Sequence, residues 1–239
     1  MFLSVIIPSK NFTNLKRCVE GLSDWGPGLR KTILDDGLAE SGYRRDTFDY
    51  EDGAILDGTT IIPGPKPFVF AVNCNIGIRS CAPDDVVLLN DDAILETPGG
   101  FTAMQQFCYE HPEYGLLSAR VKGHAHHIHA YKQGLTGISE APLDIPFVCV
   151  YIPRKVIDKV GLLDERFTGS IDGEMVYAGE DTDYCMRIRH AGYKLGVFNE
   201  CVVDHGTLPS TFRGLNGSLP INATKKRFQE IHGFPMWSR

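Results

Sequence analysis

The segment Asp84-Asp85-Val86-Val87-Leu88-Leu89-Asn90-Asp91-Asp92 decides the fold that the sequence predicts. Its four consecutive apolar residues, Val86 to Leu89, are typical of a short strand buried on both faces of a sheet. Three polar residues follow at the carboxyl end of this strand. An acidic turn would explain them, because asparagine and aspartate are common turn residues. A ligand site would also explain them, since open α/β sheets bind ligands at the carboxyl ends of their strands.

Short apolar segments with strand character alternate along the chain with segments of helical periodicity. The residues expected to form strands are 3–8, 31–34, 59–62, 86–89, 115–119, 147–152, 195–198 and 201–203. The residues expected to form helices are 14–22, 68–81, 101–111, 155–160, 184–191 and 223–231, and residues 38–58 are expected to be largely irregular. This alternation predicts parallel βαβ units, and therefore an α/β fold with helices on both faces of one sheet.

Composition excludes several classes of protein. A formal net charge of −6 and no basic stripe argue against a nucleic-acid partner. No stretch reaches the roughly 18 apolar residues of a membrane-spanning helix, and the first residues lack the basic start of a secretory signal. The seven cysteines are scattered without a C-x-x-C pair, which is typical of reduced thiols. We therefore expect a cytoplasmic protein, and peripheral contact with a membrane that carries a lipid acceptor stays open.

Acids or a histidine also follow other expected strands. Asp35-Asp36-Gly37 follows the strand 31–34, and His205 follows the strand 201–203. An Asp-Gly turn is the other explanation for the first of these. Glu180-Asp181-Thr182-Asp183 begins a helix, where acids also complement the helix dipole. Carboxylate oxygens suit Mg²⁺ or Mn²⁺, which proteins usually share with a substrate diphosphate.

Four histidines lie close together between Gly123 and Gly134, namely His124, His126, His127 and His129. A zinc site is one interpretation of this cluster. The run contains no cysteine or acid, and zinc ligands are usually spaced differently. A polar loop or hairpin is therefore the preferred interpretation.

Seven segments occur in an order that resembles glycosyltransferase family 2. They are residues 4–11, 34–37, 75–78, 88–92, 161–167, 180–183 and 187–192. The resemblance implies the GT-A fold, with a Rossmann-like, mostly parallel sheet flanked by helices and a smaller antiparallel portion on the acceptor side. It also implies a single domain over residues 1–239. Residues 1–120 would bind the nucleotide, residues 121–206 would carry the acceptor and catalytic groups, and residues 207–239 would form a C-terminal loop and helix.

The resemblance also implies a role for individual residues. Binding of the donor nucleotide sugar is implied for Pro8, Ser9, Lys10, Asp36, Asn75, Asn90 and Asp91. In such enzymes Asp36 would hydrogen-bond the base and Asp91 the ribose. Asp92 and His205 would hold the divalent metal, Mn²⁺ or Mg²⁺, and Asp181 would be the catalytic base. The residues implied to orient or stabilise the start of this helix are Glu180, Asp183 and Arg187.

The implied activity is transfer of a sugar, with inversion and with the help of a metal, from a nucleoside diphosphate to the hydroxyl of a carbohydrate or glycolipid acceptor. Two features depart from the family pattern. Cys74 stands where many members carry an arginine, and residues 168–178 resemble an insertion that would belong to the acceptor pocket. Three alternatives stay open: a nucleotide-sugar binding module without catalysis, a sugar nucleotidyltransferase and a metal-dependent hydrolase.

Overall fold

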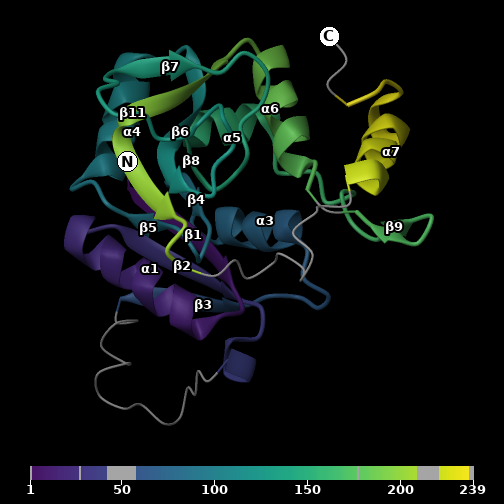
Figure 1. Cartoon of the computed structure of the whole chain (residues 1–239), viewed down its shortest axis with the longest axis horizontal. Helices are drawn as coiled ribbons and strands as arrows, with labels where there is room; N and C mark the ends of the chain where they lie inside the picture. The colour runs from purple at the N-terminus through teal and green to yellow at the C-terminus, as the bar shows by residue number, and fades with distance from the viewer. Residues whose placement is uncertain (1, 27, 42–57, 177, 209–220, 237–239) are drawn as a thin grey trace.

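A mixed sheet with helices on both faces forms the body of the molecule (Figure 1). The computed structural model describes residues 2–26, 28–41, 58–176, 178–208 and 221–236. Within these residues the sheet has nine strands, in the order β3-β2-β1-β4-β8-β6-β11-β5, with β7 paired to β11. The expected irregular segment 38–58 begins with a short 3-10 helix, Leu38–Ser41, and its residues 42–57 lie outside the described part.

The amino-terminal half of the sheet is parallel. Its strands are β1 (Leu3–Ser9), β2 (Arg30–Asp35), β3 (Thr59–Pro63) and β4 (Asp85–Leu89). Strand β1 lies between β2 and β4, with Ile6 level with Thr32 on one side and with Leu88 on the other. This arrangement confirms the expected α/β fold. Helix α1 (Phe12–Trp25) connects the parallel neighbours β1 and β2, and helix α3 (Phe70–Ser80) connects β3 to β4 across the same parallel part of the sheet.

Strand residues in this half alternate between two apolar cores. Val5 and Ile7 face the core that contains α1, whereas Ile6 faces the core that contains α3. Helix α1 buries Leu15, Cys18, Val19 and Leu22, a spacing that places them on one helical face. Helix α3 approaches β1 so closely that a Cβ on Gly77 would lie 2.5 Å from Ile6 Cγ2.

The second half of the sheet mixes directions. Its strands are β5 (Ile94–Leu95), β6 (Tyr114–Gly123), β7 (Ile138–Glu140), β8 (Cys149–Ile152) and β11 (Lys194–His205). Strand β8 runs antiparallel to both β4 and β6, whereas β6 and β11 are parallel. The two strands expected at 195–198 and 201–203 are one strand, so that expectation is wrong. A register shift between Phe198 and Val202 bends the strand without ending it.

The remaining helices cover the two faces. Helix α4 (Gly100–Glu110) packs with α1 on one face, and α5 (Arg154–Val160) and α6 (Glu180–His190) pack with α3 on the other. Residues 168–178 contain a small antiparallel hairpin of β9 (Ser170–Ile171) and β10 (Glu174–Met175). The hairpin contacts α7 (Ile221–His232), and both lie at one side of the sheet (Figure 1). Among the described helices, none is both long and apolar enough to cross a membrane.

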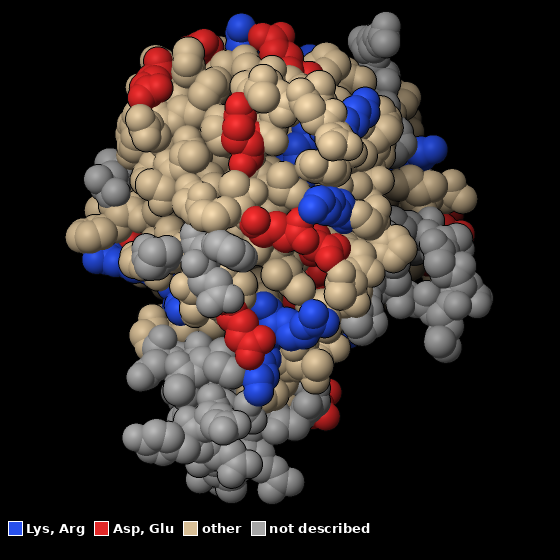
Figure 2. Space-filling model, turned by 60° about the vertical axis from the view of Figure 1, so that its left-hand side comes forward, with Lys and Arg blue, Asp and Glu red and all other residues tan. Residues whose placement is uncertain are grey.

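Charged side chains of both signs are interspersed on the face shown in Figure 2. Lysine and arginine appear there in small separate groups, several of them beside acidic residues. Salt bridges on the surface of the protein include Lys122 with Glu96 and Lys194 with Glu140. Such exposed pairs contribute little to stability, roughly 0–1 kcal/mol each.

Candidate active site

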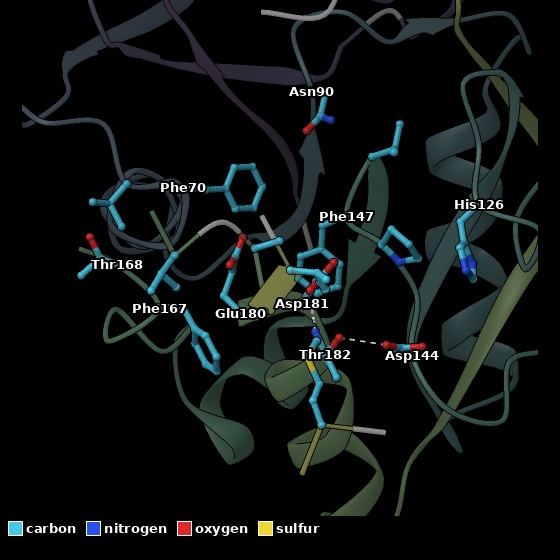
Figure 3. Close-up of a pocket in the computed structure, with 18 of the residues that line it drawn as sticks. Phe70, Asn90, His126, Asp144, Phe147, Phe167, Thr168, Glu180, Asp181 and Thr182 are labelled. Carbon is cyan, nitrogen blue, oxygen red and sulfur yellow. Dashed lines mark hydrogen bonds between the residues drawn. The ribbon is translucent and has the colours of Figure 1, made fainter. Parts of the chain in front are cut away.

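A cavity of about 640 Å³ opens where the carboxyl ends of β1 and β4 meet the start of α6. It brings together six of the residues that the sequence predicted for the site, namely Pro8, Asn90, Asp92, Glu180, Asp181 and His205. Figure 3 shows Asn90 on one side of this cavity and Glu180 and Asp181 on another. Pro8, Asn90 and Glu180 are each more than 80 residues apart in the chain, so tertiary packing creates the cavity.

Asp92 and His205 form a close pair within the cavity. His205 Nε2 lies 3.1 Å from Asp92 Oδ1, and both side chains are about nine-tenths buried. The other ring nitrogen, His205 Nδ1, lies 2.6 Å from the backbone oxygen of His124. Because a carbonyl oxygen can only accept, Nδ1 carries the proton and the lone pair of the neutral ring is on Nε2, towards Asp92.

This pair fits a divalent cation. A carboxylate oxygen and an imidazole lone pair that face each other are stabilised when a positive charge lies next to both. Within the described residues, no group of three or more His, Cys, Asp or Glu side chains is arranged to enclose a metal. The geometry therefore suits a metal such as Mn²⁺ or Mg²⁺ that takes its other ligands from a bound diphosphate and water.

Asp91 and Ser9 hold the ends of β4 and β1 together. Ser9 Oγ donates a hydrogen bond of 2.6 Å to Asp91 Oδ2, and both residues are buried. The backbone N–H of Asp36 donates to Ser9 O at 2.8 Å and adds the end of β2 to the same arrangement. Neither Ser9 nor Asp91 is among the described residues that line the cavity. Their contact with a nucleotide stays a prediction, and their position next to Pro8 is compatible with it.

Asp36 lies beside two lysines. Its carboxylate Oδ1 is 3.1 Å from Lys66 Nζ, which also donates to the backbone oxygen of Asp36. Burial raises the pKa of Asp36, although the positive charges of Lys66 and of the exposed Lys10 oppose this shift. The residue is thus a buried acceptor at the end of β2, outside the cavity lining, where its predicted contact with the base remains to be tested.

Asn75 is placed differently from the other predicted donor-binding residues. Its Nδ2 donates to Leu163 O at 2.9 Å and to Glu165 Oε1 at 2.8 Å, and its Oδ1 accepts from Leu163 N at 3.0 Å. The side chain is buried and is not among the described residues that line the cavity. These contacts tie α3 to the loop before the hairpin, so the arrangement gives the predicted nucleotide contact no support.

Glu180 and Asp181 begin α6. Gly179 precedes them with φ of +109°, and a Cβ at this position would lie 2.7 Å from the ring of Phe167. Only glycine combines this backbone conformation with this close approach. Asp181 Oδ1 accepts from the backbone N–H of Thr182 at 2.7 Å. Thr182 Oγ1 in turn donates to Asp144 Oδ2 at 2.8 Å, as Figure 3 shows.

Burial raises the pKa values of both acids at the start of α6. For Glu180 the next cause is the negative charge of Asp181. For Asp181 the charge of Asp144 adds to burial, whereas the N–H of Thr182 acts in the opposite direction. A carboxylate with a raised pKa is a stronger base than a solvated one, so Asp181 is suited to accept a proton.

Asp183 and Arg187 belong to the framework behind the site. Arg187 Nη2 lies 2.7 Å from Asp183 Oδ2, and the guanidinium also donates to the backbone oxygens of Val160 and Leu162. His232 of α7 lies 3.1 Å from the other carboxylate oxygen of Asp183. These contacts fix the first turn of α6 against its neighbours, and the orienting role that the sequence predicted for this pair stays a prediction.

The histidine-rich segment forms a loop, as preferred from the sequence. His129 is fully buried, accepts from the backbone N–H of His126 and has its pKa lowered to about 3, chiefly by burial. It is therefore a neutral core residue. His126 and His127 instead line the cavity, with ring centroids 4.0 Å apart. The sequence shows that these histidines are clustered, but it does not indicate which of them line the cavity and which are buried in the core.

Sequence reasoning missed the apolar wall of the cavity and Asp144. Phe70, Phe147 and Phe167 line this wall (Figure 3), and Val176 also belongs to it. An apolar residue at a cavity wall has the same local pattern as one in the core, so no motif marked these positions. Asp144 lies in a Pro-containing loop that carries no metal or catalytic motif. The hairpin 168–178 does line the cavity through Thr168, Gly169, Met175, Val176 and Ala178.

The similarity of this chain to known proteins is low in sequence and extensive in fold. No protein-family model matches the chain. A curated relative, the uncharacterized protein y4gI of Sinorhizobium fredii (strain NBRC 101917 / NGR234), is 22% identical in an alignment of 222 positions that covers 80% of this chain and 23% of that protein. The chain thus spans about a quarter of the length of this relative.

Two solved structures share the architecture. One is GalNAc-T7 with UDP, GalNAc and Mn²⁺, with a TM-score of 0.70 and 13% identity over 97% of this chain and 47% of that chain. The other is the mannosyltransferase PcManGT of Pyrobaculum calidifontis with GDP-Man and Mn²⁺, with a TM-score of 0.60 and 13% identity over 88% and 58% of the two chains. The sheet order, the helices on both faces and these similarities together show that the chain has the GT-A fold.

Proposed function

We propose that this protein transfers a sugar from a nucleoside-diphosphate sugar to an acceptor hydroxyl, with metal assistance and with inversion, as in glycosyltransferase family 2. One observation carries the proposal. The Asp92–His205 pair and the acid Asp181 face a single cavity at the carboxyl edge of a GT-A sheet. The bound molecules named for the two structural neighbours, UDP or GDP-Man with Mn²⁺, support a nucleotide-sugar donor and a divalent metal.

Asp92 and His205 would hold the metal. Bound there, it would act as a Lewis acid that neutralises the charge on the departing diphosphate. The composition of the cavity supports the need for it, since no lysine or arginine is among the described residues that line the wall. His124 contributes indirectly, because its carbonyl keeps the proton of His205 on Nδ1 and leaves Nε2 to coordinate.

Asp181 would take the proton of the acceptor hydroxyl. A hydroxyl is a weak nucleophile, and a carboxylate within hydrogen-bond reach activates it by accepting its proton as the new bond forms. The Thr182 N–H holds one oxygen of Asp181 at 2.7 Å and so orients the carboxylate. A single displacement in which the acceptor attacks opposite to the leaving diphosphate gives an inverted anomeric centre.

The nucleotide would lie along the ends of β1, β2 and β4. Pro8 and Asn90 line the cavity, and the buried Asp36 and Asp91 lie at the ends of the neighbouring strands. In this proposal residues 1–120 bind the donor, and the later half binds the acceptor. All seven cysteines lie in the described part and are free thiols, which supports a reducing compartment such as the cytoplasm.

The test is incubation of the purified chain with UDP-, GDP- and dTDP-sugars, Mn²⁺ and a panel of acceptors. Release of nucleoside diphosphate together with a glycosylated product of inverted configuration, assigned by NMR, would support the proposal. The matched control is Asp181→Asn, which keeps the size of the side chain and removes the base. Binding of nucleoside diphosphate and Mn²⁺ without any turnover would instead favour a nucleotide-sugar binding module. Release of free sugar in the presence of acceptors would favour a hydrolase.

A further inference from the structure

The wall of the cavity around Asp181 is mainly apolar. The ring centroids of Phe147 and Tyr184 lie 6.2 Å apart in an edge-to-face arrangement, and Tyr184 belongs to α6, the helix that begins near Asp181. Phe147 and Leu143 both line the cavity. The other side is lined by Phe167, Val176 and Met236. Figure 3 shows Phe147 and Phe167 with the two acids between them. A hydroxyl that reaches Asp181 is therefore attached to a molecule whose remaining part contacts apolar side chains.

The second side of the wall has its own support. Phe167, Val176 and Met236 form a small core with Ala223 and Phe228 of α7, separate from the two cores that pack on the sheet. Phe167 and Phe228 have ring centroids 6.2 Å apart. The hairpin and α7 thus present a packed apolar surface to the cavity.

Charge restricts the occupant further. Four acids line the cavity, namely Asp92, Asp144, Glu180 and Asp181, and the described lining contains no lysine or arginine. Once a metal and a diphosphate balance each other near Asp92, the remaining acids lie on the acceptor side. An anionic acceptor would meet negative charge there, with no cationic partner among the described residues of the lining, which is unfavourable at low local dielectric.

The rim of the cavity continues the apolar surface to solvent. Leu143 is 41% exposed and Met175 is 61% exposed, although both line the cavity. Long apolar side chains at the mouth extend the contact surface beyond the acids. A saccharide with many hydroxyl groups would leave its polar groups without partners along this surface, at a cost for each one.

Resting on the function proposed above, we propose that the acceptor is a neutral hydroxyl compound linked to an alkyl group of about eight carbons or more. The hydroxyl lies at Asp181, and the alkyl group lies between Phe147 and Phe167 and leaves past Leu143 and Met175. The transfer forms the bond from the acceptor oxygen to the anomeric carbon and breaks the bond from that carbon to the diphosphate. The proton goes to Asp181.

The probes are methyl and octyl glycosides of glucose, galactose, mannose and N-acetylglucosamine, each used below the micellar concentration of the octyl compound. We expect kcat/KM for the best octyl glycoside to exceed that of its methyl partner by at least about tenfold, because each buried methylene contributes to binding. Octyl glucuronide, which carries a carboxylate, is expected to be at least about tenfold poorer than octyl glucoside. Equal rates for the methyl and octyl compounds, or faster transfer to an unlipidated disaccharide, would overturn the inference and leave the proposed function standing.

Two rim residues offer a variant with a matched control. The double variant Leu143→Ser/Met175→Ser is expected to lower the ratio of kcat/KM for the octyl glycoside to kcat/KM for the methyl glycoside about fivefold. Leu135→Ser is the control, since Leu135 is also 41% exposed but does not line the cavity. An unchanged ratio in the double variant would show that the alkyl group binds elsewhere and would refute the inference.

A binding measurement separates the two proposals. Titration of octyl and methyl glucoside into the full chain with UDP and Mn²⁺ measures the alkyl preference without any turnover. If no sugar is transferred but octyl glucoside binds at least tenfold more tightly, the transferase proposal fails and the apolar site is upheld. If neither glucoside binds in preference to the other, the inference is wrong whatever the catalytic result.

Discussion

The two ends of strand β4 carry the same pair of residues and serve different purposes. Asp84 and Asp85 stand at its start, and Asp91 and Asp92 follow its end. All four are buried, with exposed fractions between 1% and 6%. Neither residue type nor burial therefore distinguishes the two pairs.

Their partners do distinguish them. At the start, Asp85 accepts hydrogen bonds from Gln105 Nε2, Tyr109 OH, Tyr151 OH and the backbone N–H of Arg154, at 2.6 to 3.0 Å. Asp84 accepts from Ser4 Oγ and Arg30 Nη1. At the end, Asp92 instead lies 3.1 Å from the imidazole nitrogen of His205, at the wall of the cavity. A buried acid surrounded by donors stabilises the fold, whereas one that faces an imidazole nitrogen and a cavity is suited to bind a cation.

The largest expected effect concerns the acid across the cavity from Asp92. Asp181→Asn should lower kcat for transfer by about 10²- to 10⁴-fold, because an amide cannot accept the proton of the acceptor hydroxyl. The melting temperature should change little, since asparagine can still accept from the Thr182 N–H. Steady-state kinetics together with thermal unfolding test this, and a variant as active as the wild type would disprove the role of Asp181.

Asp92→Asn tests the carboxyl end of β4, which faces the cavity. We expect transfer at fixed Mn²⁺ to fall by about 10²- to 10³-fold, since the charge that holds the cation is lost. Part of the activity should return at higher Mn²⁺ concentration, so the half-maximal Mn²⁺ concentration is the informative quantity. Calorimetric titration of Mn²⁺ with UDP present should show the same weakening, and unchanged metal affinity would exclude Asp92 as a ligand.

Asp85→Ala tests the start of β4, where the carboxylate is surrounded by hydrogen-bond donors. Removing this carboxylate leaves several buried donors without an acceptor, so the free energy of unfolding should fall by about 3 kcal/mol. Activity per folded molecule should stay within about twofold of the wild type at temperatures below the transition. Urea unfolding and active-site-normalised rates measure the two quantities. A strong loss of activity without loss of stability would remove the contrast between the two ends of β4.

Glu180→Gln should change how stability depends on pH. The raised pKa of Glu180 means that the folded state binds its proton more tightly than the unfolded state does. Wild-type stability therefore decreases as pH rises from the ordinary glutamate pKa through the raised folded value. The variant should be more stable than the wild type at pH 8, by up to about 1.4 kcal/mol for each unit of pKa shift removed, and equal to it near pH 4. The same pH slope in both proteins would count against a buried, titrating Glu180.

The smallest effect is expected from Asp144→Asn. The charge of Asp144 contributes to the raised pKa of Asp181, after burial. Removing this charge should move the acid limb of the kcat/KM profile to lower pH by a few tenths of a unit. The amide oxygen can still accept from Thr182 Oγ1, so rates at high pH should be retained. A shift to higher pH would contradict the assigned electrostatic role.

The α/β architecture and most of the segments that meet at the cavity could be predicted from the amino-acid sequence. The short apolar runs of β1 and β4 and the helical spacing in α1 predict the elements, because these patterns depend on near neighbours in the chain. Polar residues at the ends of apolar strands predict a site, since a parallel sheet brings those ends to one edge. Asn90, Asp92 and His205 were predicted in this way, Asp181 was predicted from its place at a helix start and from the family resemblance, and all four line the cavity.

Tertiary structure decided which of the conspicuous residues face the cavity and which face other side chains. Asn75 belongs to a segment that resembles a family motif, but its side-chain amide hydrogen-bonds the backbone of Leu163, which is 88 residues away in the chain. Asp85 and Asp92 differ only in what surrounds them. The apolar wall was not visible in the sequence, because Phe147 and Phe167 resemble core residues until their neighbours are known. Local propensity acts over a few residues, whereas burial, hydrogen-bond partners and charge neighbours depend on contacts between distant segments.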